Sequence, residues 1–391
     1  MSTNKAATVH NNKGDLFSSI NVEDFDTPHG KDEVWRFISL RRLRGLHNGR
    51  FAQAVPAEIA IDEPENGVKV ERVAKTDAKV GRAGAPIDRV SAQAFTSSKE
   101  AYVVTVARNA VVTEPIKISV TGQGNDATSF GHIVIDVEAN AEALVDLRYT
   151  GTGTHADNVE FLIGDNARLT VIVDASWDNT AVHLSGQQAV LGRDAVLRHN
   201  VAVFGGEVVR LVPRVKFTQP GGDAEMLGIY FADDGQYFEQ RLLVDHAVPQ
   251  CRSNVLYKGA IQGDKNSPLP DAHATWVGDV LIRSGAQGTD TYEANRNLVL
   301  TDGARADAIP NLEIETGDIA GAGHAATVGR FDDEHEFYLR SRGIPQDEAR
   351  RLIIRGFFSE VINRIPVDSV REDLENRVSE ELKTFQNSRN A

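Results

Sequence analysis

The sequence predicts a mainly β fold, a solenoid of stacked parallel β coils flanked by an N-terminal and a C-terminal helical region. Short runs in the middle of the chain alternate apolar and polar residues, as strands do. Polar turn residues recur there at nearly constant spacing, and the pattern becomes helical after Phe331. We therefore divide the 391 residues into an arm and helical region, 1–100, a β core, 101–330, and a C-terminal helical region, 331–391.

The N-terminal region begins with a polar stretch and continues with a helical pattern. Residues 1–13 are rich in asparagine and have no apolar segment of the kind that signal peptides carry. From Lys31 to Leu46, Val34, Phe37 and Leu40 are spaced so that one helix face collects them. We expect a mobile arm followed by a helix over Lys31 to Leu46.

The β core is predicted from strand-like runs and from the turns between them. The runs are Tyr102 to Val106, Ile116 to Val120, Ile133 to Val137, Leu169 to Val173, Val208 to Val212, Leu242 to Val244 and Val277 to Ile282. Asn140, Asn166, Asp194 and Asp223 each precede an alanine and recur at intervals of 26, 28 and 29 residues. This step suits stacked coils. An antiparallel sandwich is the alternative, although its turns recur at about 8 to 12 residues.

The C-terminal region is predicted to contain three helices. Asp332 to Arg342 has acidic residues in its first turn and arginines in its last, which complements the helix dipole, and Gly343 is placed to end it. Pro345 suits the first turn of a second helix with a broad apolar face, and a third helix follows Pro366.

Composition excludes several functional classes. The chain has 42 basic and 56 acidic residues, a net charge of -14, which disfavours nucleic acid and anionic membranes as partners. No apolar run reaches the length of about 18 residues that a membrane span needs. Because Cys251 is the single cysteine, the chain has no internal disulfide and no thiolate set for a metal. We expect a cytoplasmic protein that binds neither nucleic acid nor membrane.

The motifs for catalysis are weak. A Gly-x-x-x-x-Gly-Lys-Ser/Thr phosphate-binding loop is absent from the sequence, so we expect no ATP hydrolysis by this chain. Gly321 to Ala326 matches a dinucleotide-binding pattern formally, but Thr327 and Val328 continue it as strand or loop and not as a helix. Cys251 is either a reactive thiolate beside Arg252 or a buried small residue, and we favour the buried residue.

His324 is the strongest candidate for a functional residue. Small residues surround it from Gly321 to Ala326, so large neighbours cannot easily cover its ring. Asp332, Asp333, Glu334 and His335 follow closely and would complete a metal site if the fold gathered them. The alternative is that the acids cap a helix and His335 faces solvent.

The chain resembles the SufB/SufD family of iron-sulfur cluster assembly proteins, and most closely its SufD branch. The resemblance lies in His246 to Gly259, Ala286 to Leu298, Pro310 to Ile314, the loop around His324, and Phe337 to Pro345. It implies a right-handed parallel β-helix and a scaffold subunit without catalytic activity. It also implies pairing with a SufB-like paralogue through the β-helices and docking of a SufC-like ATPase on the C-terminal helices, where the expected contacts are Phe337, Tyr338, Arg340, Arg342, Phe357 and Phe358.

The resemblance also assigns a role to His324. The histidine of the SufD pattern falls on it and is expected to bind iron of a nascent cluster at the interface with the SufB-like subunit. Ala322 stands where many members have cysteine, so this loop supplies no thiolate. No cofactor is expected to bind the chain alone tightly; the cluster would be transient and shared. Whether reduced flavin binds the complex, and whether a homodimer forms without the paralogue, stays open.

Three other interpretations remain. A SufB-like paralogue would carry Glu-His-Glu-Ala in place of Gly323 to Ala326 and more cysteines. A β-helix enzyme acting on polysaccharide would need a line of catalytic side chains along one strand face. A self-associating structural solenoid would never contact the ATPase.

Overall fold

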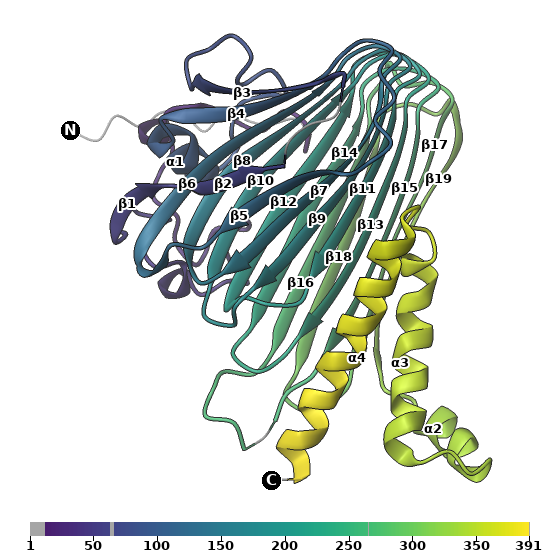
Figure 1. Cartoon of the computed structure of the whole chain (residues 1–391). Helices are drawn as coiled ribbons and strands as arrows, with labels where there is room; N and C mark the ends of the chain where they lie inside the picture. Colours follow the sequence, from purple (N-terminus) through teal and green to yellow (C-terminus); the bar gives the residue numbers. More distant parts are fainter. Residues whose placement is uncertain (1–11, 63–65, 265, 391) are drawn as a thin grey trace.

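The computed structural model describes residues 12–62, 66–264 and 266–390, and it confirms a parallel β-solenoid with helices toward both ends of the chain (Figure 1). From β4 onward, successive strands alternate between two sheets, so each coil places one strand in each sheet. One sheet contains, in order, β3 (Val68–Ala74), β4 (Glu100–Val106), β6 (Gly124–Val137), β8 (Gly153–Ile163), β10 (Val182–Leu191), β12 (Val208–Phe217), β14 (Tyr237–His246), β16 (His273–Ile282) and β18 (Arg305–Ile314), with β1 (Gln53–Pro56) beside β6.

The second sheet faces the first across the core. It contains, in order, β2 (Glu58–Ile61), β5 (Ile116–Thr121), β7 (Glu142–Gly151), β9 (Arg168–Trp177), β11 (Val196–Val203), β13 (Asp223–Ala232), β15 (Arg252–Ile261), β17 (Thr289–Val299) and β19 (Ile319–Arg330). Pairing is parallel throughout except where β3 meets β4 and β2 meets β5. The solenoid sheets therefore reach back beyond residue 101, and two antiparallel strands close their N-terminal end.

Stacked side chains form the interior. Leu147 pairs with Val173 and Val173 with Val201 in consecutive coils, and all three are buried. Each coil thus covers the apolar residues of the next, as expected for a solenoid whose coils cannot bury their inner faces alone.

The recurring polar turn residues mark one corner of the coils. Asn140, Asn166 and Asp194 have φ values of 60°, 56° and 52°, the left-handed region that asparagine and aspartate tolerate better than most residues. The amide of Asn140 donates a hydrogen bond to Oδ1 of Asn109 at 2.9 Å, and the amide of Asn166 donates to Oδ1 of Asn140 at 3.3 Å. Three members of the repeat found in the sequence therefore form a ladder of turn residues, whereas Asp223 begins β13 and Gly221, with a φ of 85°, takes the left-handed position in that turn.

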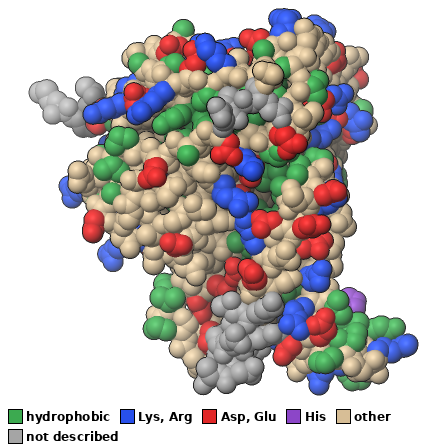
Figure 2. All heavy atoms as spheres, in the orientation of Figure 1, with side chains coloured by type: hydrophobic (Ala, Val, Ile, Leu, Met, Phe, Trp, Pro, Cys, Tyr) green, Lys and Arg blue, Asp and Glu red, His purple; other side chains and the backbone are tan. Residues whose placement is uncertain are grey.

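The three predicted C-terminal helices are present as α2 (Asp333–Ser341), α3 (Gln346–Ile362) and α4 (Asp368–Asn390). The side chain of Asp332 accepts a hydrogen bond from the backbone N–H of Glu334 at 2.8 Å and caps α2. The buried residues of α3 and α4 pack with Leu227, Ile229 and Phe231 of β13 in one cluster on the flank of the solenoid. Figure 2 shows charged and hydrophobic side chains mixed over the surface of this end.

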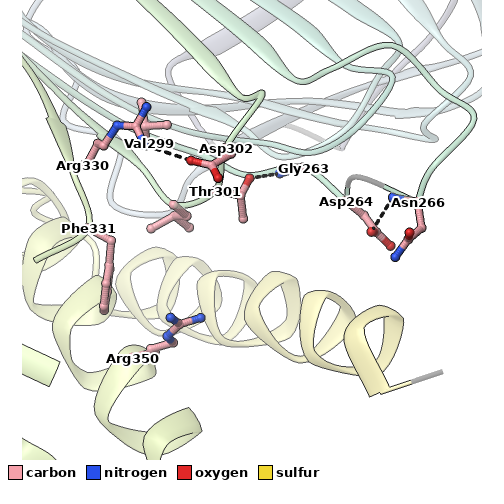
Figure 3. A pocket seen from close by; sticks show the side chains of 10 residues that line it. Gly263, Asp264, Asn266, Val299, Thr301, Asp302, Arg330, Phe331 and Arg350 are labelled. Atoms are coloured by element: carbon pink, nitrogen blue, oxygen red, sulfur yellow. Dashed lines mark hydrogen bonds and ion pairs between the residues drawn. The ribbon is translucent and has the colours of Figure 1, made fainter. Parts of the chain in front are cut away.

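A pocket of about 420 Å³ lies where the solenoid meets α3 (Figure 3). Phe331, directly after β19, and Arg350 of α3 line it, together with turn residues of the solenoid such as Thr301. The guanidinium of Arg350 stacks 5.2 Å from the centre of the Phe331 ring and pairs with Glu336 at 2.7 Å. These contacts fix α2 and α3 relative to the last coil.

The N-terminal region covers the outer face of the sheet that contains β12. The described part has two short 3-10 segments, η1 (Val22–Asp24) and η2 (Leu40–Leu43), and one α-helix, α1 (Arg89–Ser97). The predicted helix from Lys31 to Leu46 is wrong, because this stretch consists of turns around η2. Ser39 is extended and Arg44 is left-handed, and either conformation interrupts a helix. The apolar residues of the stretch are nevertheless buried against the sheet.

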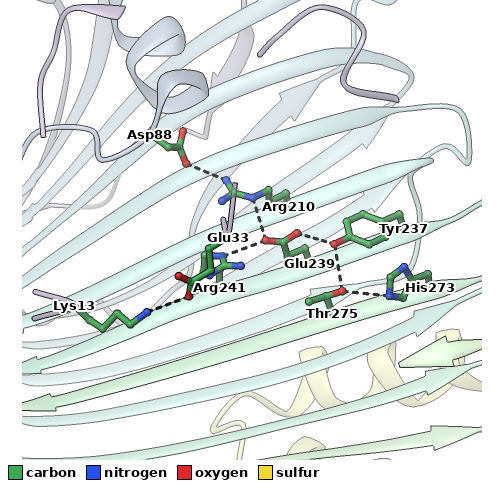
Figure 4. A network of polar contacts seen from close by, with 9 residues as sticks. All are labelled: Lys13, Glu33, Asp88, Arg210, Tyr237, Glu239, Arg241, His273 and Thr275. Carbon is green, nitrogen blue, oxygen red and sulfur yellow. Dashed lines mark hydrogen bonds and ion pairs between the residues drawn. The ribbon is translucent and has the colours of Figure 1, made fainter. Parts of the chain in front are cut away.

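A buried polar network holds this region in place (Figure 4). Arg210 of β12 pairs with Asp88, the N-cap of α1, at 3.0 Å and with Glu239 of β14 at 3.2 Å. Its guanidinium also stacks 4.3 Å from the centre of the Trp35 ring. Tyr237 donates a hydrogen bond to the second oxygen of Glu239 at 2.7 Å. A buried charge satisfied on several sides favours one arrangement of the arm.

Candidate functional site

The C-terminal end of the solenoid is open. β18 and β19 each pair with one neighbouring strand, and none of their residues is fully buried. From Ile319 to Gly329, His324 is the only residue of β19 that is not small, apolar or a threonine. Charged side chains normally protect a strand edge from pairing with another chain. The edge of β19 lacks this protection.

His324 lies on this open strand. It stands in register with Glu293 of β17, so the two side chains share the inward face of their sheet. The His324 side chain is 44% exposed, and its Nδ1 lies 3.8 Å from Oε1 of Glu293. A Cβ at Gly323 would lie 3.1 Å from the Tyr292 ring, so glycine leaves room for this ring beside β19. The exposed imidazole predicted from the sequence is therefore present, at the mouth of the solenoid interior.

Glu293 was not predicted from the sequence. Its side chain is buried, and neither carboxylate oxygen has a hydrogen-bond partner of normal geometry in the described chain. Burial, together with the nearby charge of Asp279, raises the pKa of Glu293 to about 8, although a backbone hydrogen bond from Asn311 acts in the opposite direction. The sequence did carry a signal that could have identified Glu293. Thr291, Glu293 and Asn295 are polar residues at alternate, buried positions of one strand, β17, and such positions are usually apolar.

The acidic residues after Phe331 do not join His324. Asp332 caps α2, as the alternative interpretation predicted, and its Oδ2 pairs with Nδ1 of His335 at 3.0 Å. His335 is exposed. The structure therefore brings His324 together with Glu293 and leaves Asp332 and His335 as a separate pair on the helix.

Cys251 is a buried free thiol. Its Sγ makes long contacts with the carbonyl oxygens of Pro249, at 3.5 Å, and Gln219, at 3.7 Å. Burial raises the pKa of Cys251, which keeps the thiol protonated and poorly nucleophilic. The geometry matches the structural role favoured from the sequence.

A second group with metal-ligand chemistry lies deep in the core. The ligand atoms of His155, Asp157 and His183 lie within 4.8 Å of one another. Asp157 accepts a hydrogen bond from Tyr149 at 2.7 Å, and its oxygens lie 3.3 Å from His155 and 3.6 Å from His183. Burial disfavours the charged carboxylate, but the two histidines outweigh it and lower the pKa of Asp157. We interpret this buried group as a structural part of the core.

The surface of α2 carries the exposed part of the expected docking residues. Phe337 and Tyr338 are 74% and 57% exposed, and the guanidinium of Arg342 stacks 5.2 Å from the centre of the Tyr338 ring. Arg340 pairs with Glu336 on the same helix at 3.6 Å. Figure 2 shows hydrophobic and basic side chains together over this end of the molecule.

The two phenylalanines of α3 are placed differently. Phe358 is fully buried, with its ring 6.4 Å from that of Phe231, and Phe357 is partly buried beneath the ammonium of Lys258. The broad apolar face of α3 packs on the solenoid and on α4. Its width is therefore explained by contacts within the chain, and Phe358, which the resemblance led us to expect as an ATPase contact, is not available at the surface.

Comparison with known proteins gives one consistent result. Residues 119–357 match the family model described as the SufBD core domain of the SUF system for iron-sulfur cluster assembly. An iron-sulfur cluster assembly SufBD family protein of Mycobacterium tuberculosis is 57% identical over 374 residues, which cover 96% of this chain and 94% of the relative. The corresponding Mycobacterium leprae protein is 56% identical over 371 residues, which cover 95% and 94%.

A more distant relative is the iron-sulfur cluster assembly protein SufD of Bacillus subtilis. It is 27% identical over 286 residues, which cover 71% of this chain and 63% of the relative. The family match covers more than half of the chain and includes the open strands and His324. The chain belongs to the SufB/SufD family of iron-sulfur cluster assembly proteins.

Proposed function

We propose that the chain is a SufD-like scaffold subunit that pairs with a SufB-like paralogue, binds a SufC-like ATPase and helps to hold a nascent iron-sulfur cluster. The observation that carries this proposal is the position of His324, which is exposed on the open terminal strand of the solenoid. Because His324 lies on a strand edge that can pair with another chain, it would become part of a complete metal site only when the partner subunit binds.

Pairing through the open end follows from the strand edge. β19 presents backbone N–H and C=O groups along an edge of small, uncharged residues, which suits the addition of a strand from another chain. A SufB-like solenoid of the same family would offer edges of the same kind. A homodimer in the absence of the paralogue would use the same edge.

Docking of the ATPase is assigned to α2. Phe337 and Tyr338 present aromatic surface beside Arg340 and Arg342, and buried aromatic and arginine residues dominate the binding energy of many interfaces. α2 is joined to the last coil through Phe331 and Arg350. Movement of the ATPase subunits would therefore act directly on the end of the solenoid that carries His324.

The chemistry of the open end limits what this subunit supplies. Neutral imidazole is a suitable iron ligand, but Cys251 is buried in the core and Ala322 provides no thiolate. The partner must therefore provide the thiolates that iron-sulfur clusters require. The iron and sulfur are cargo, and the chain acts as a non-catalytic scaffold.

A SufB-like role is the second candidate. The residues around His324 favour the SufD-like role, since Gly323 and Ala325 stand where SufB-like sequences have glutamates. Binding of reduced flavin to the complex and a cytoplasmic location stay predictions.

Co-expression with the SufB-like and SufC-like proteins tests the proposal. We expect the three proteins to purify together with a cluster that is visible in absorbance spectra. His324→Ala should preserve the complex and remove the cluster, whereas His29→Ala, at an exposed histidine of the N-terminal region, should change neither. A complex of the His324→Ala variant with its full cluster content would refute the proposal. The isolated chain should show no ATPase activity above background.

A further inference from the structure

We propose that Glu293 is a second metal ligand, so that this chain presents a histidine and a carboxylate to iron at the open end of the solenoid. The inference rests on the proposed function of His324 and deepens it, because it names the second donor of the same site. The pair lies on adjacent strands, β17 and β19, and faces the same interior.

The distance between the two side chains suits a shared ion. Metal bonds to histidine nitrogen and carboxylate oxygen are about 2.0 to 2.2 Å long, so two ligands of one ion lie about 3 to 3.5 Å apart. Nδ1 of His324 and Oε1 of Glu293 are 3.8 Å apart, which is too long for a hydrogen bond. A small rotation of the exposed imidazole would bring both atoms within bonding distance of one cation.

Glu293 has no side-chain hydrogen bond that would explain its place in the interior. Toward the core it stands above the apolar Val255 of β15, and neither carboxylate oxygen has a hydrogen bond of normal geometry in the described residues; the backbone N–H of Asn311 interacts with it only weakly. A Cβ at Gly278 would lie 2.5 Å from Oε2, so glycine in the opposite sheet leaves the space that the carboxylate occupies. An unpaired buried carboxylate either destabilises the fold or stays neutral.

The chemistry fits iron. Imidazole and carboxylate together bind Fe²⁺ in many proteins, and a cation between the two would supply the partner that Glu293 lacks. Both donor side chains also lie at the open end of the solenoid, where we expect the partner to bind. His324 is half exposed on the terminal strand, and Glu293 is directly behind it by one coil.

The first experiment compares isosteric variants in the complete complex. Glu293→Gln preserves the shape of the side chain and removes the anionic donor. Glu313→Gln is the matched control, because Glu313 lies on the neighbouring terminal strand and accepts a hydrogen bond from the backbone N–H of Lys13. We expect Glu293→Gln to lower the cluster content of the purified complex at least about 10-fold, as the loss of a ligand does, and the control to retain it.

The second experiment does not depend on cluster assembly. The full chain, labelled with ¹³C-histidine, is titrated with Co²⁺ as a substitute for Fe²⁺, and the His324 resonance is identified by its absence in His324→Gln. We expect the midpoint of the paramagnetic shift to rise at least about 10-fold in Glu293→Gln. Equal midpoints, or a His324 resonance that does not respond at millimolar Co²⁺, would overturn the inference.

The two experiments separate the failure of this inference from the failure of the proposed function. If His324→Ala removes the cluster while Glu293→Gln retains wild-type content, Glu293 is not a ligand and the proposed function stands. If His324→Ala retains the cluster, the proposed function fails whatever the Co²⁺ titration shows. Loss of the cluster in Glu293→Gln with an unchanged Co²⁺ midpoint would also overturn the role of Glu293 as a ligand.

Discussion

The two ends of the solenoid differ in how their edge strands are built. At the N-terminal end, β3 carries Lys69, Glu71 and Arg72 and pairs antiparallel with β4, which interrupts the parallel series. At the C-terminal end, β19 continues the parallel series and carries no aspartate, glutamate, lysine or arginine between Ile319 and Gly329. Charges on an edge strand oppose pairing with another chain. The comparison indicates that one end is closed and the other is prepared for a partner.

The buried carboxylates of the two regions show the same contrast. Asp157, in the closed region, has Tyr149 and two histidines around it. Glu293, at the open end, is equally buried and has no side-chain hydrogen bond in the described chain, only a weak interaction with the backbone N–H of Asn311. Although Oδ1 of Asp157 also lacks a hydrogen bond of normal geometry, tyrosine and histidine neighbours stabilise that carboxylate, whereas the surroundings of Glu293 leave its carboxylate able to accept a ligand.

Isosteric amides at these two carboxylates should give the largest difference in stability. Asp157→Asn removes the anion that Tyr149, His155 and His183 surround and should lower the free energy of unfolding by about 3 kcal/mol. Glu293→Gln replaces a carboxyl group that is largely protonated at neutral pH, because its pKa is about 8, and should leave stability within about 0.5 kcal/mol. Denaturant unfolding of the two isolated variants measures both values. A larger loss for Glu293→Gln would show that Glu293 is structural.

A lysine on each edge should separate the two ends as pairing surfaces. Thr327→Lys places a charge on the exposed part of β19 and should weaken binding of the SufB-like partner about 100-fold. Ala60→Lys places the same charge on the exposed part of β2 and should have no effect. Titration calorimetry or size-exclusion chromatography measures the affinities. Weakening by Ala60→Lys alone would mean that the closed end is the interface.

Removal of aromatic surface from α2 should have a smaller effect. The double variant Phe337→Ala and Tyr338→Ala should weaken binding of the SufC-like ATPase at least about 10-fold without changing the melting temperature, since both rings are exposed. Val111→Ala, at an exposed valine before β5, is the matched control. Unchanged ATPase binding by the double variant would place the docking surface elsewhere.

Lowering the pH should reduce the stability of the fold, and this is the smallest of the expected effects. Burial lowers the pKa of His199 to about 4 and that of His246 to about 3, from an ordinary value of 6.5. As the pH falls below 6.5, the unfolded chain therefore takes up protons that the folded chain excludes, and stability decreases toward pH 4. We expect the melting temperature to fall by a few degrees over this range, and less steeply in the double variant His199→Gln and His246→Gln. If the melting temperatures of the wild-type chain and the double variant fell equally with pH, His199 and His246 would not be the cause of the acid sensitivity.

Much of the fold could be predicted because the repeat is local. The spacing of Asn140, Asn166 and Asp194 predicted the turns of successive coils, which the structure shows to be left-handed. The distribution of charges over residues 332–342 predicted α2. The helix predicted from Lys31 to Leu46 was wrong. The apolar residues of this stretch are spaced as they would be in a helix, but they pack against the sheet from a series of turns.

The candidate site could be predicted only in part. His324 stood out because its neighbours are small. Glu293 lies 31 residues earlier in the sequence, and only the register of β17 with β19 brings it beside His324. Phe358 has the same residue type as Phe337, but its burial depends on β13, which sequence periodicity does not place beside α3.

Hydrogen-deuterium exchange on the full chain, with and without the SufB-like partner, would show which end of the solenoid the partner covers. We expect the partner to protect backbone amides of β18 and β19 from exchange and to leave those of β2 and β3 unchanged. Protection confined to β2 and β3, or an unchanged β19 in a complex that still carries its cluster, would contradict pairing through the open end.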